Sequence, residues 1–255
     1  MSGTPNNFFS WIIFLLQQYH GLYFSGLITT LETSLLGTVL GCVLGFAVGV
    51  VQCSSGEDET TPARKTLFSL LRGIVKVYVT VFRGTPMIVQ AMVIFYGISE
   101  AFGVNMPAFQ AAILIITLNT GAYMSETVRG GIQSIDKGQT EGALALGMNR
   151  FPMMMHIILP QTMRVIFPQI GNTFVGNIKD TSVLNVISVT ELFYITNVAA
   201  GTYFRMFEAY TITAMIYLTL TLAFNLLFRI IEVTMAGRES YTVVGAVEPG
   251  VEVTA

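Results

Sequence analysis

The sequence predicts an all-α integral membrane protein with about five transmembrane helices. Hydrophobic residues make up 53% of the 255 residues and charged residues only 11%, whereas soluble domains carry about 25% charged residues. Several runs reach the roughly 20 apolar residues that a helix needs to cross a bilayer. The net charge of −2 shows no excess of basic residues that would indicate nucleic-acid binding. The two cysteines, Cys42 and Cys53, are expected to be free thiols, with no disulfide or metal site.

The N-terminal part of the chain divides into an interfacial segment and a first span. Residues 1–24 mix aromatic and polar side chains at helical spacing, which is typical of a helix at headgroup depth. Span one is expected over 27–51 and carries a glycine at every fourth position from Gly37 to Gly49. Small residues at this spacing allow another helix to approach closely. That helix belongs either to the same chain or to a second subunit.

Span two, expected over 77–98, contains a built-in break. Its Arg83-Gly84-Thr85-Pro86 sequence must kink or interrupt the helix, because proline removes a backbone donor and clashes with the preceding turn. Irregular backbone at membrane depth is tolerated only where it is covered by protein or lines a wet cavity. Arg83 is therefore expected either to line a cavity or to cap the break.

Span three, expected over 108–128, carries a polar stripe. Asn119, Tyr123 and Glu126 follow one another at i, i+4 and i+7, which places them on one helical face. Such a stripe faces the helix bundle or a transport pathway and not lipid.

Span four, expected over 165–187, contains two adjacent charges, Lys179 and Asp180. Sequence neighbours on a helix point about 100° apart, so each charge needs its own partner or water. Two structural ion pairs would satisfy them, but a transport pathway is favoured, because intramembrane charges most often mark one. Span five is expected over 208–231, and a polar tail follows at 236–255.

The distribution of basic residues predicts the orientation. By the positive-inside rule, the N-terminus lies outside and the C-terminus in the cytoplasm, with only Arg205 clearly on the outer side. Residues 136–160 are then cytoplasmic, and a short helix over 141–146, ended by Gly147, is placed to dock a soluble partner. The basic residues on the cytoplasmic side are Arg64, Lys65, Arg72, Lys76, Arg129, Lys137, Arg150, Arg164, Arg229 and Arg238.

The chain carries no phosphate-cradling or zinc-protease motif and no nucleophile with an evident base. An enzyme is therefore not expected, and any ATPase that drives transport must be a separate polypeptide.

Several motifs together resemble the ABC importer permeases. Glu141-Gly142-Ala143, three residues, Gly147, nine residues and Ile157-Ile158-Leu159-Pro160 match the EAA loop of that family. Further motifs resemble its polar amino-acid branch, and the likeness covers nearly all of 25–232. They are RGTP at 83–86, NTGAYMSE at 119–126, RGGIQS at 129–134 and KDTSVL at 179–184.

This resemblance implies a type I ABC importer-like fold, with 25–235 as the permease domain, in a bacterial inner (plasma) membrane. It implies a homodimer or heterodimer of permease subunits, two cytoplasmic ATPases and an extracytoplasmic substrate-binding protein. The chain itself would hold no cofactor, because ATP and Mg belong to the ATPases. The short helix would be the coupling helix seated on the ATPase. Its expected contacts are Glu141, Gly142, Ala143, Leu144, Gly147 and Arg150.

The expected function is amino-acid import by alternating access. Relatives often show GNEF where this chain has GNTF at 171–174. Because Thr173 supplies no acid and Lys179 is close, a neutral polar or acidic substrate is favoured over a cationic one. The expected pathway residues, whose alternative role is to stabilise the bundle, are Asn119, Tyr123, Glu126, Thr173, Lys179, Asp180, Thr181 and Ser182.

A stand-alone ion-coupled secondary transporter or channel is the alternative function, with Glu126, Lys179 and Asp180 as an ion relay. Five spans without an inverted repeat argue against it. A non-transporting scaffold would leave the Lys179–Asp180 pair without a purpose.

Overall fold

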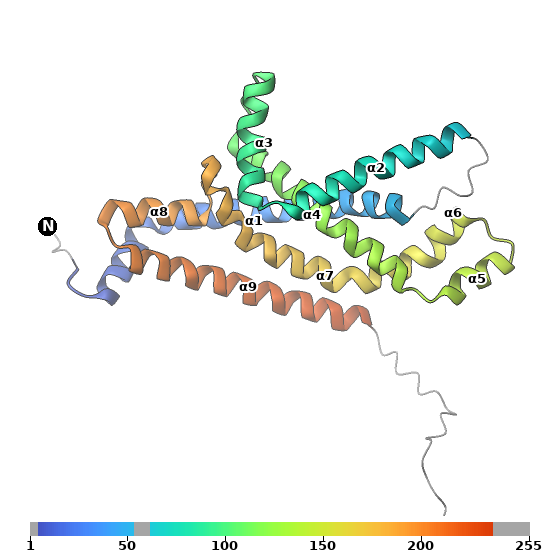
Figure 1. Ribbon diagram of the computed structural model, residues 1–255. Coiled ribbons are helices and arrows are strands. Elements are labelled where there is room, and N and C mark those ends of the chain that lie inside the picture. The colour runs from blue at the N-terminus through green and yellow to red at the C-terminus, as the bar shows by residue number, and fades with distance from the viewer. Residues whose placement is uncertain (1–4, 54–61, 237–255) are drawn as a thin grey trace, which may run out of the picture.

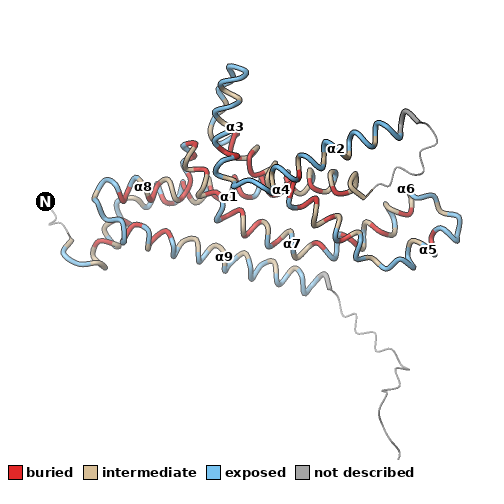
Figure 2. Tube along the Cα trace, in the orientation of Figure 1, coloured by how far each residue is buried: buried red, intermediate tan, exposed pale blue. Residues whose placement is uncertain are grey.

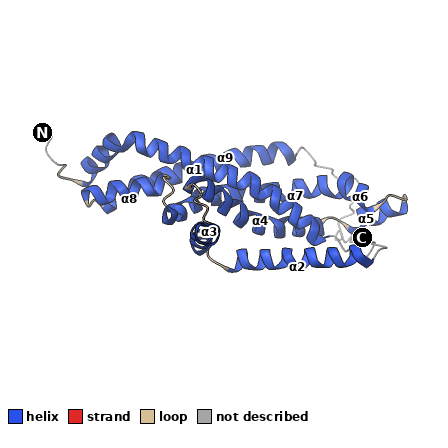
Figure 3. Cartoon of the chain, turned by 90° about the horizontal axis from the view of Figure 1, so that it is seen from above, coloured by secondary structure: helices blue, strands red, loops and turns tan. Residues whose placement is uncertain are grey.

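A computed structural model describes residues 5–53 and 62–236 of the chain. The described residues are helical apart from short connections, as Figures 1 and 3 show, and the predicted all-α class is confirmed. The predicted tail beyond Ala236, with Arg238, and the loop 54–61 lie outside the described residues. The elements are α1 (Phe8–Cys53), α2 (Pro62–Gly84), α3 (Met87–Phe102), α4 (Ala108–Ser134), α5 (Lys137–Ala145), α6 (Arg150–Met153), the π-helical turn η1 (Met154–Ile158), α7 (Leu159–Asp180), the 3-10 helix η2 (Thr181–Ile187), α8 (Leu192–Tyr203) and α9 (Met206–Ala236).

By length and composition, three described helices suffice to cross a membrane alone. They are α1, α4 and most of α9. Two bent pairs qualify as one span each, α2 with α3 and the run 150–187 with α8, which brings the number of candidate spans in the described residues to as many as five. The predicted number of spans is confirmed on this count.

Two segments differ from the predicted boundaries. The interfacial helix expected within residues 1–24 and span one form a single helix, α1, because the sequence offers no proline between them. Span two is not one straight helix. It consists of α2, which starts as early as Pro62, and α3, and the chain bends by 117° between them. Pro86, in extended conformation with φ −64° and ψ 139°, starts the new helix.

The glycine stripe of α1 packs within the chain. Each of its four glycines faces one residue of α4, and these partners also repeat every fourth position. A Cβ atom added at Gly45 would lie 2.5 Å from Cβ of Met124 and 2.9 Å from the carbonyl oxygen of Gly121. The two helices therefore touch backbone to side chain at all four glycines. The facing pairs are Gly37–Ile116, Gly41–Thr120, Gly45–Met124 and Gly49–Val128.

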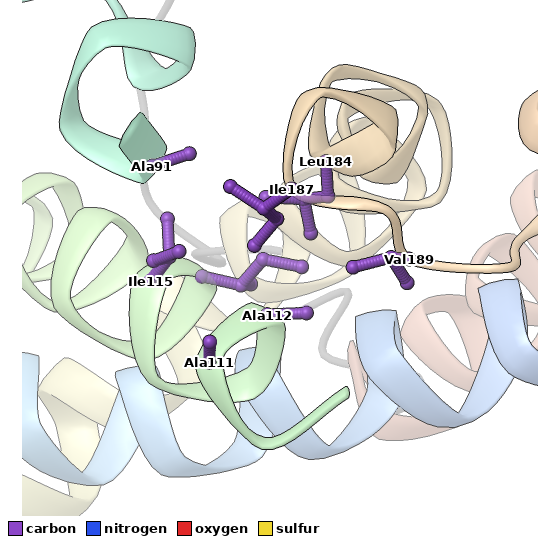
Figure 4. Packing of buried hydrophobic residues seen from close by; sticks show 8 residues of the cluster. Ala91, Ala111, Ala112, Ile115, Leu184, Ile187 and Val189 are labelled. Atoms are coloured by element: carbon purple, nitrogen blue, oxygen red, sulfur yellow. The ribbon is translucent and has the colours of Figure 1, made fainter. Parts of the chain in front are cut away.

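The buried residues concentrate where α1 packs against α4, α7 and α8, and the outward faces of α2, α3 and α9 are exposed (Figure 2). One core cluster joins the first turns of α3, through Ala91, to α4 and to η2, as Figure 4 shows for Ile115, Leu184 and Ile187. On α9, apolar side chains such as Met215 and Leu222 are 59–60% exposed. Extended apolar surface of this kind suits hydrocarbon and is unusual in water.

Candidate functional site

The predicted coupling helix is present as α5, at the end of the molecule opposite the N-terminus (Figure 1). It begins one turn earlier than the sequence analysis predicted, because Asp136 is a capping residue. The Asp136 carboxylate accepts a hydrogen bond from the backbone N–H of Gly138 at 2.6 Å. An N-cap of this type satisfies a helix donor and stabilises the helix by about 1 kcal/mol.

Gly147 ends α5, as the sequence predicts. Its φ of +77° lies in the left-handed region, which side chains disfavour. The Gly147 N–H donates to the Leu144 carbonyl at 2.9 Å, and the Met148 N–H donates to the Ala143 carbonyl at 3.1 Å. This pair of bonds is the Schellman arrangement. The helix therefore stops at a fixed point and does not fray.

One face of α5 is anchored and the other is open. Ala143 is buried against Met153 and Ile158, which begin the run into α7. The other predicted coupling residues are exposed: Glu141, Gly142, Leu144, Gly147 and Arg150. This arrangement leaves a surface for a partner while tying the helix to the base of a span.

A polar clamp closes the α2–α3 break. Gln90 is buried, and its Nε2 donates to the carbonyl oxygens of Phe82 at 2.8 Å and Thr85 at 2.9 Å. Its Oε1 accepts from Asn119 Nδ2 at 2.9 Å. Asn119, a predicted pathway residue, is therefore engaged in holding the break. Gln90 was not among the predicted site residues; a lone glutamine four positions after Pro86 in an apolar helix was the available signal.

Replacing Gln90 with leucine is expected to destabilise the permease, although the two side chains have similar volumes. Two carbonyls and the Asn119 amide would lose their partner, and each orphaned group costs about 1–3 kcal/mol. We expect a thermal midpoint in detergent lower by about 5 °C or more, since 1 kcal/mol shifts the midpoint by about 2–4 °C at this size. The matched control is Gln110→Leu on the exposed surface of α4. An equal shift in both variants would contradict the clamp.

An ion cluster lies toward the C-terminal end of the α4 stripe. Arg129 holds Glu126 with two donors, at 2.7 and 3.2 Å. Arg83 Nη1 lies 3.6 Å from the same carboxylate oxygen, and its guanidinium sits 5.7 Å from the ring centre of Tyr123. A cleft of about 670 Å³ lies between α2 and α4, and its lining includes Lys76, Arg83, Tyr123 and Glu126. Of the two predicted roles for Arg83, the geometry supports the cavity-lining one.

The predicted pathway residues of α7 and η2 divide into exposed and buried groups. Lys179 and Asp180 are both exposed, and no ion pair joins them in the described part of the chain. Ser182 is half-buried and donates to the Lys179 carbonyl at 2.7 Å. Thr173 is half-buried and donates to the Gln169 carbonyl at 2.8 Å. Thr181 is completely buried and donates to the Ile178 carbonyl, so it does not line an accessible surface here.

One buried polar residue that was not singled out from the sequence, Asn177, joins three helices. Asn177 donates to the hydroxyls of Thr38 at 2.7 Å and Thr120 at 2.9 Å, which links α7 to α1 and α4. Buried polar groups of this kind stabilise a bundle only when they are fully paired.

Glu191 is completely buried and caps α8. Its carboxylate accepts from the N–H groups of Phe193 at 2.8 Å and Tyr194 at 2.7 Å, and from the Tyr217 hydroxyl at 2.9 Å. Glu191 was not among the residues singled out from the sequence.

Proteins of similar sequence are permeases. The probable amino-acid permease protein YxeN of Bacillus subtilis (strain 168) is 36% identical over 174 residues, covering 68% of this chain and 78% of that protein. The probable glutamine ABC transporter permease protein GlnM of the same organism is 30% identical over 205 residues, covering 80% and 89%. The glutamine transport system permease protein GlnP of Escherichia coli (strain K12) is 36% identical over 157 residues, covering 61% and 72%.

Solved structures share the fold. A chain from the crystal structure of an amino acid ABC transporter with histidines has a TM-score of 0.77 at 32% identity, covering 91% of this chain and all of that chain. A chain of the inward-facing MetNI methionine ABC transporter has a TM-score of 0.66 at 18% identity, covering 86% and 96%, and shows the fold alone.

Residues 63–236 match a family described as "Binding-protein-dependent transport system inner membrane component". The match spans most of the helical part of the chain, from α2 to α9. With the helices able to span a membrane, it confirms the resemblance that the motifs of α2, α4, α5 and α7 predict. The chain therefore belongs to the family of binding-protein-dependent transport system inner membrane components, as a permease subunit.

Proposed function

We propose that this permease imports amino acids and is driven by ATP hydrolysis in separate subunits. The observation that carries the proposal is α5, a capped helix between two spans, anchored on one face and exposed on the other. Similar proteins named as amino-acid and glutamine permeases support the substrate class. A rigid helix in this position transmits a push from a partner, whereas a flexible loop would absorb it.

The proposed assembly contains a second permease subunit, two ATPases that hold ATP and Mg, and an extracytoplasmic binding protein. The N-terminus is placed outside and the C-terminus in the cytoplasm. This orientation agrees with the basic residues of α2, α5 and α6, which include Lys65, Lys137 and Arg150, and it puts α5 on the side where ATP is available.

In the proposed cycle, closure of the ATPase pair moves α5, and the cluster of Ala143, Met153 and Ile158 carries the movement into η1 and α7. The spans then open outward to receive the amino acid from the binding protein, and hydrolysis reopens the inner side. A neutral polar or acidic amino acid is the proposed substrate, because α7 offers Thr173 where a cationic side chain would favour an acid, and Lys179 is exposed on the same helix.

The deciding experiment is co-purification with the ATPase encoded beside this chain, followed by ATPase assays with the binding protein and amino acids. We expect a stable complex and amino-acid-stimulated hydrolysis. Uptake in vesicles that needs an ion gradient but no ATP would replace the proposal with the secondary transporter.

Asp180→Asn is expected to slow amino-acid uptake while leaving the complex with the ATPase intact. Asp180 is exposed at the end of α7, and removing a charged hydrogen-bond partner from a bound substrate costs about 1.5–3 kcal/mol, roughly tenfold or more in uptake. Uptake kinetics in proteoliposomes measure the effect. The control is Glu100→Gln, which removes an exposed charge at the end of α3. Unchanged kinetics for Asp180→Asn would remove this residue from the pathway.

A further inference from the structure

The cleft between α2 and α4 carries more positive than negative charge. Among the described residues, Lys76 and Arg83 line it together with one carboxylate, Glu126, and Arg129 binds that carboxylate from the side. Counted over the part of the chain that the structure describes, three cations against one anion leave an excess of two positive charges at the cleft. Such a cleft attracts an anionic group and repels a cationic one.

Arg83 has donors to spare. Glu126 is already held by two donors of Arg129, at 2.7 and 3.2 Å, whereas Arg83 approaches it only to 3.6 Å. No described residue accepts a hydrogen bond of ordinary length from the Arg83 guanidinium, and its side chain is 44% exposed. An arginine presents its donors as a planar fork that fits a carboxylate with two parallel bonds.

The surroundings hold this guanidinium in place. It lies 5.7 Å from the ring centre of Tyr123, within the range of a cation–π contact. It stands at the end of α2, where Gln90 fixes the backbone by bonding the Phe82 and Thr85 carbonyls. A charge on a broken span cannot face hydrocarbon without a large cost, so the open side of Arg83 faces a wet cavity.

We propose that the α2–α4 cleft is a carboxylate-binding subsite, in which Arg83, supported by Lys76, binds the α-carboxylate of the amino acid in transit. Tyr123 and Glu126 position the guanidinium. This inference rests on the proposed function. The subsite would bind the α-carboxylate, which every amino acid has, and other residues would select the substrate side chain.

The test uses the complete importer in proteoliposomes with its ATPase and binding protein. Radiolabelled standard amino acids are screened, and the one taken up fastest by the unsubstituted importer becomes the probe. The measured quantity is the number of amino-acid molecules imported per ATP hydrolysed. Arg83→Gln is expected to lower this ratio tenfold or more, because hydrolysis continues when the carboxylate is not captured.

The matched control is Arg205→Gln. Arg205 also stacks on an aromatic ring, 4.5 Å from that of Trp11, also lies 3.6 Å from a carboxylate, that of Glu208, and has the same exposed fraction of 44%. It lies between α8 and α9, outside the cleft. We expect its ratio to stay within twofold of the unsubstituted importer, since any defect in binding-protein docking lowers uptake and hydrolysis together.

Two further variants separate charge from folding. Lys76→Glu changes an exposed residue and is expected to lower the ratio at least fivefold. Arg83→Cys, made with Cys42→Ser and Cys53→Ser, is expected to regain activity with a positively charged thiol reagent but not with a negatively charged one.

The outcomes distinguish the two proposals. If the unsubstituted importer takes up no amino acid, the proposed function fails first. If it does take one up, an unchanged ratio in Arg83→Gln or in Lys76→Glu overturns the subsite, and so does equal recovery with both thiol reagents. If Arg83→Gln does not assemble, Lys76→Glu and the thiol reagents decide.

Discussion

Gly147→Arg is expected to reduce ATP-driven uptake at least tenfold while the permease still accumulates in the membrane. At φ +77° the arginine backbone is strained, at a cost of about 1–3 kcal/mol for a residue held in a sparsely populated conformation. The C-terminal cap of α5, with its bonds to Leu144 and Ala143, then loosens. Because an added Cβ atom meets nothing within 4 Å, the long charged side chain projects over the surface proposed to meet the ATPase. Uptake and co-purification with the ATPase measure the two consequences.

Gly142→Ala is the control for this variant. Gly142 lies within α5, also has open space around its missing Cβ, and has no positive φ. Alanine there improves helix propensity by up to about 1 kcal/mol and restores the alanine of the EAA pattern, so uptake is expected to be unchanged or slightly higher. Normal ATP-driven uptake by Gly147→Arg would remove α5 from its coupling role.

Gly45→Leu is expected to prevent α1 from packing on α4 and to lower the yield of folded permease severalfold. The Cβ atom alone would lie 2.5 Å from Met124 and 2.9 Å from the Gly121 carbonyl oxygen, so the two helices must separate. Overpacking a tight contact typically costs about 1–3 kcal/mol, and more where backbone must move. Thermal unfolding of the purified protein and its abundance in membranes measure the loss.

Gly21→Leu is the matched control, because Gly21 is in the same helix and an added Cβ atom there meets nothing within 4 Å. It should retain normal abundance. If Gly45→Leu folds as well as Gly21→Leu, the close contact between α1 and α4 is not needed for folding.

Much of this architecture follows from local rules that act within a short stretch of chain. Apolar length predicts the spans, and the glycine and proline of 84–86 predict the break between α2 and α3. Gly147 predicts the end of α5, because a left-handed residue after a helix is most often glycine. The EAA spacing then predicts the family, which the match over residues 63–236 confirms.

The features that sequence reasoning left open depend on which faces meet in three dimensions. The period of the α1 glycines fits a second subunit as well as α4, and only the facing residues, such as Met124, settle the packing. The hydrogen bond from the Asn119 amide to Gln90, 29 positions away in sequence, also depends on how α3 and α4 meet, and the polar stripe of α4 alone does not reveal it. The sequence does not reveal that Glu191 is a buried helix cap. Burial of its carboxylate is tolerable only because three donors from separate residues bond it in the folded chain.

The glutamine clamp has a consequence for how the chain enters the bilayer during synthesis. A helix interrupted at 84–86 would carry free carbonyls into hydrocarbon, where each costs several kcal/mol. Gln90 belongs to the same bent segment, five and eight positions from the carbonyls of Thr85 and Phe82. The segment can therefore satisfy its own break before α4 has left the ribosome, and Asn119 bonds the remaining amide oxygen when it arrives. The broken span could then insert without a partner helix, and later packing of the bundle would fix the conformation of the break.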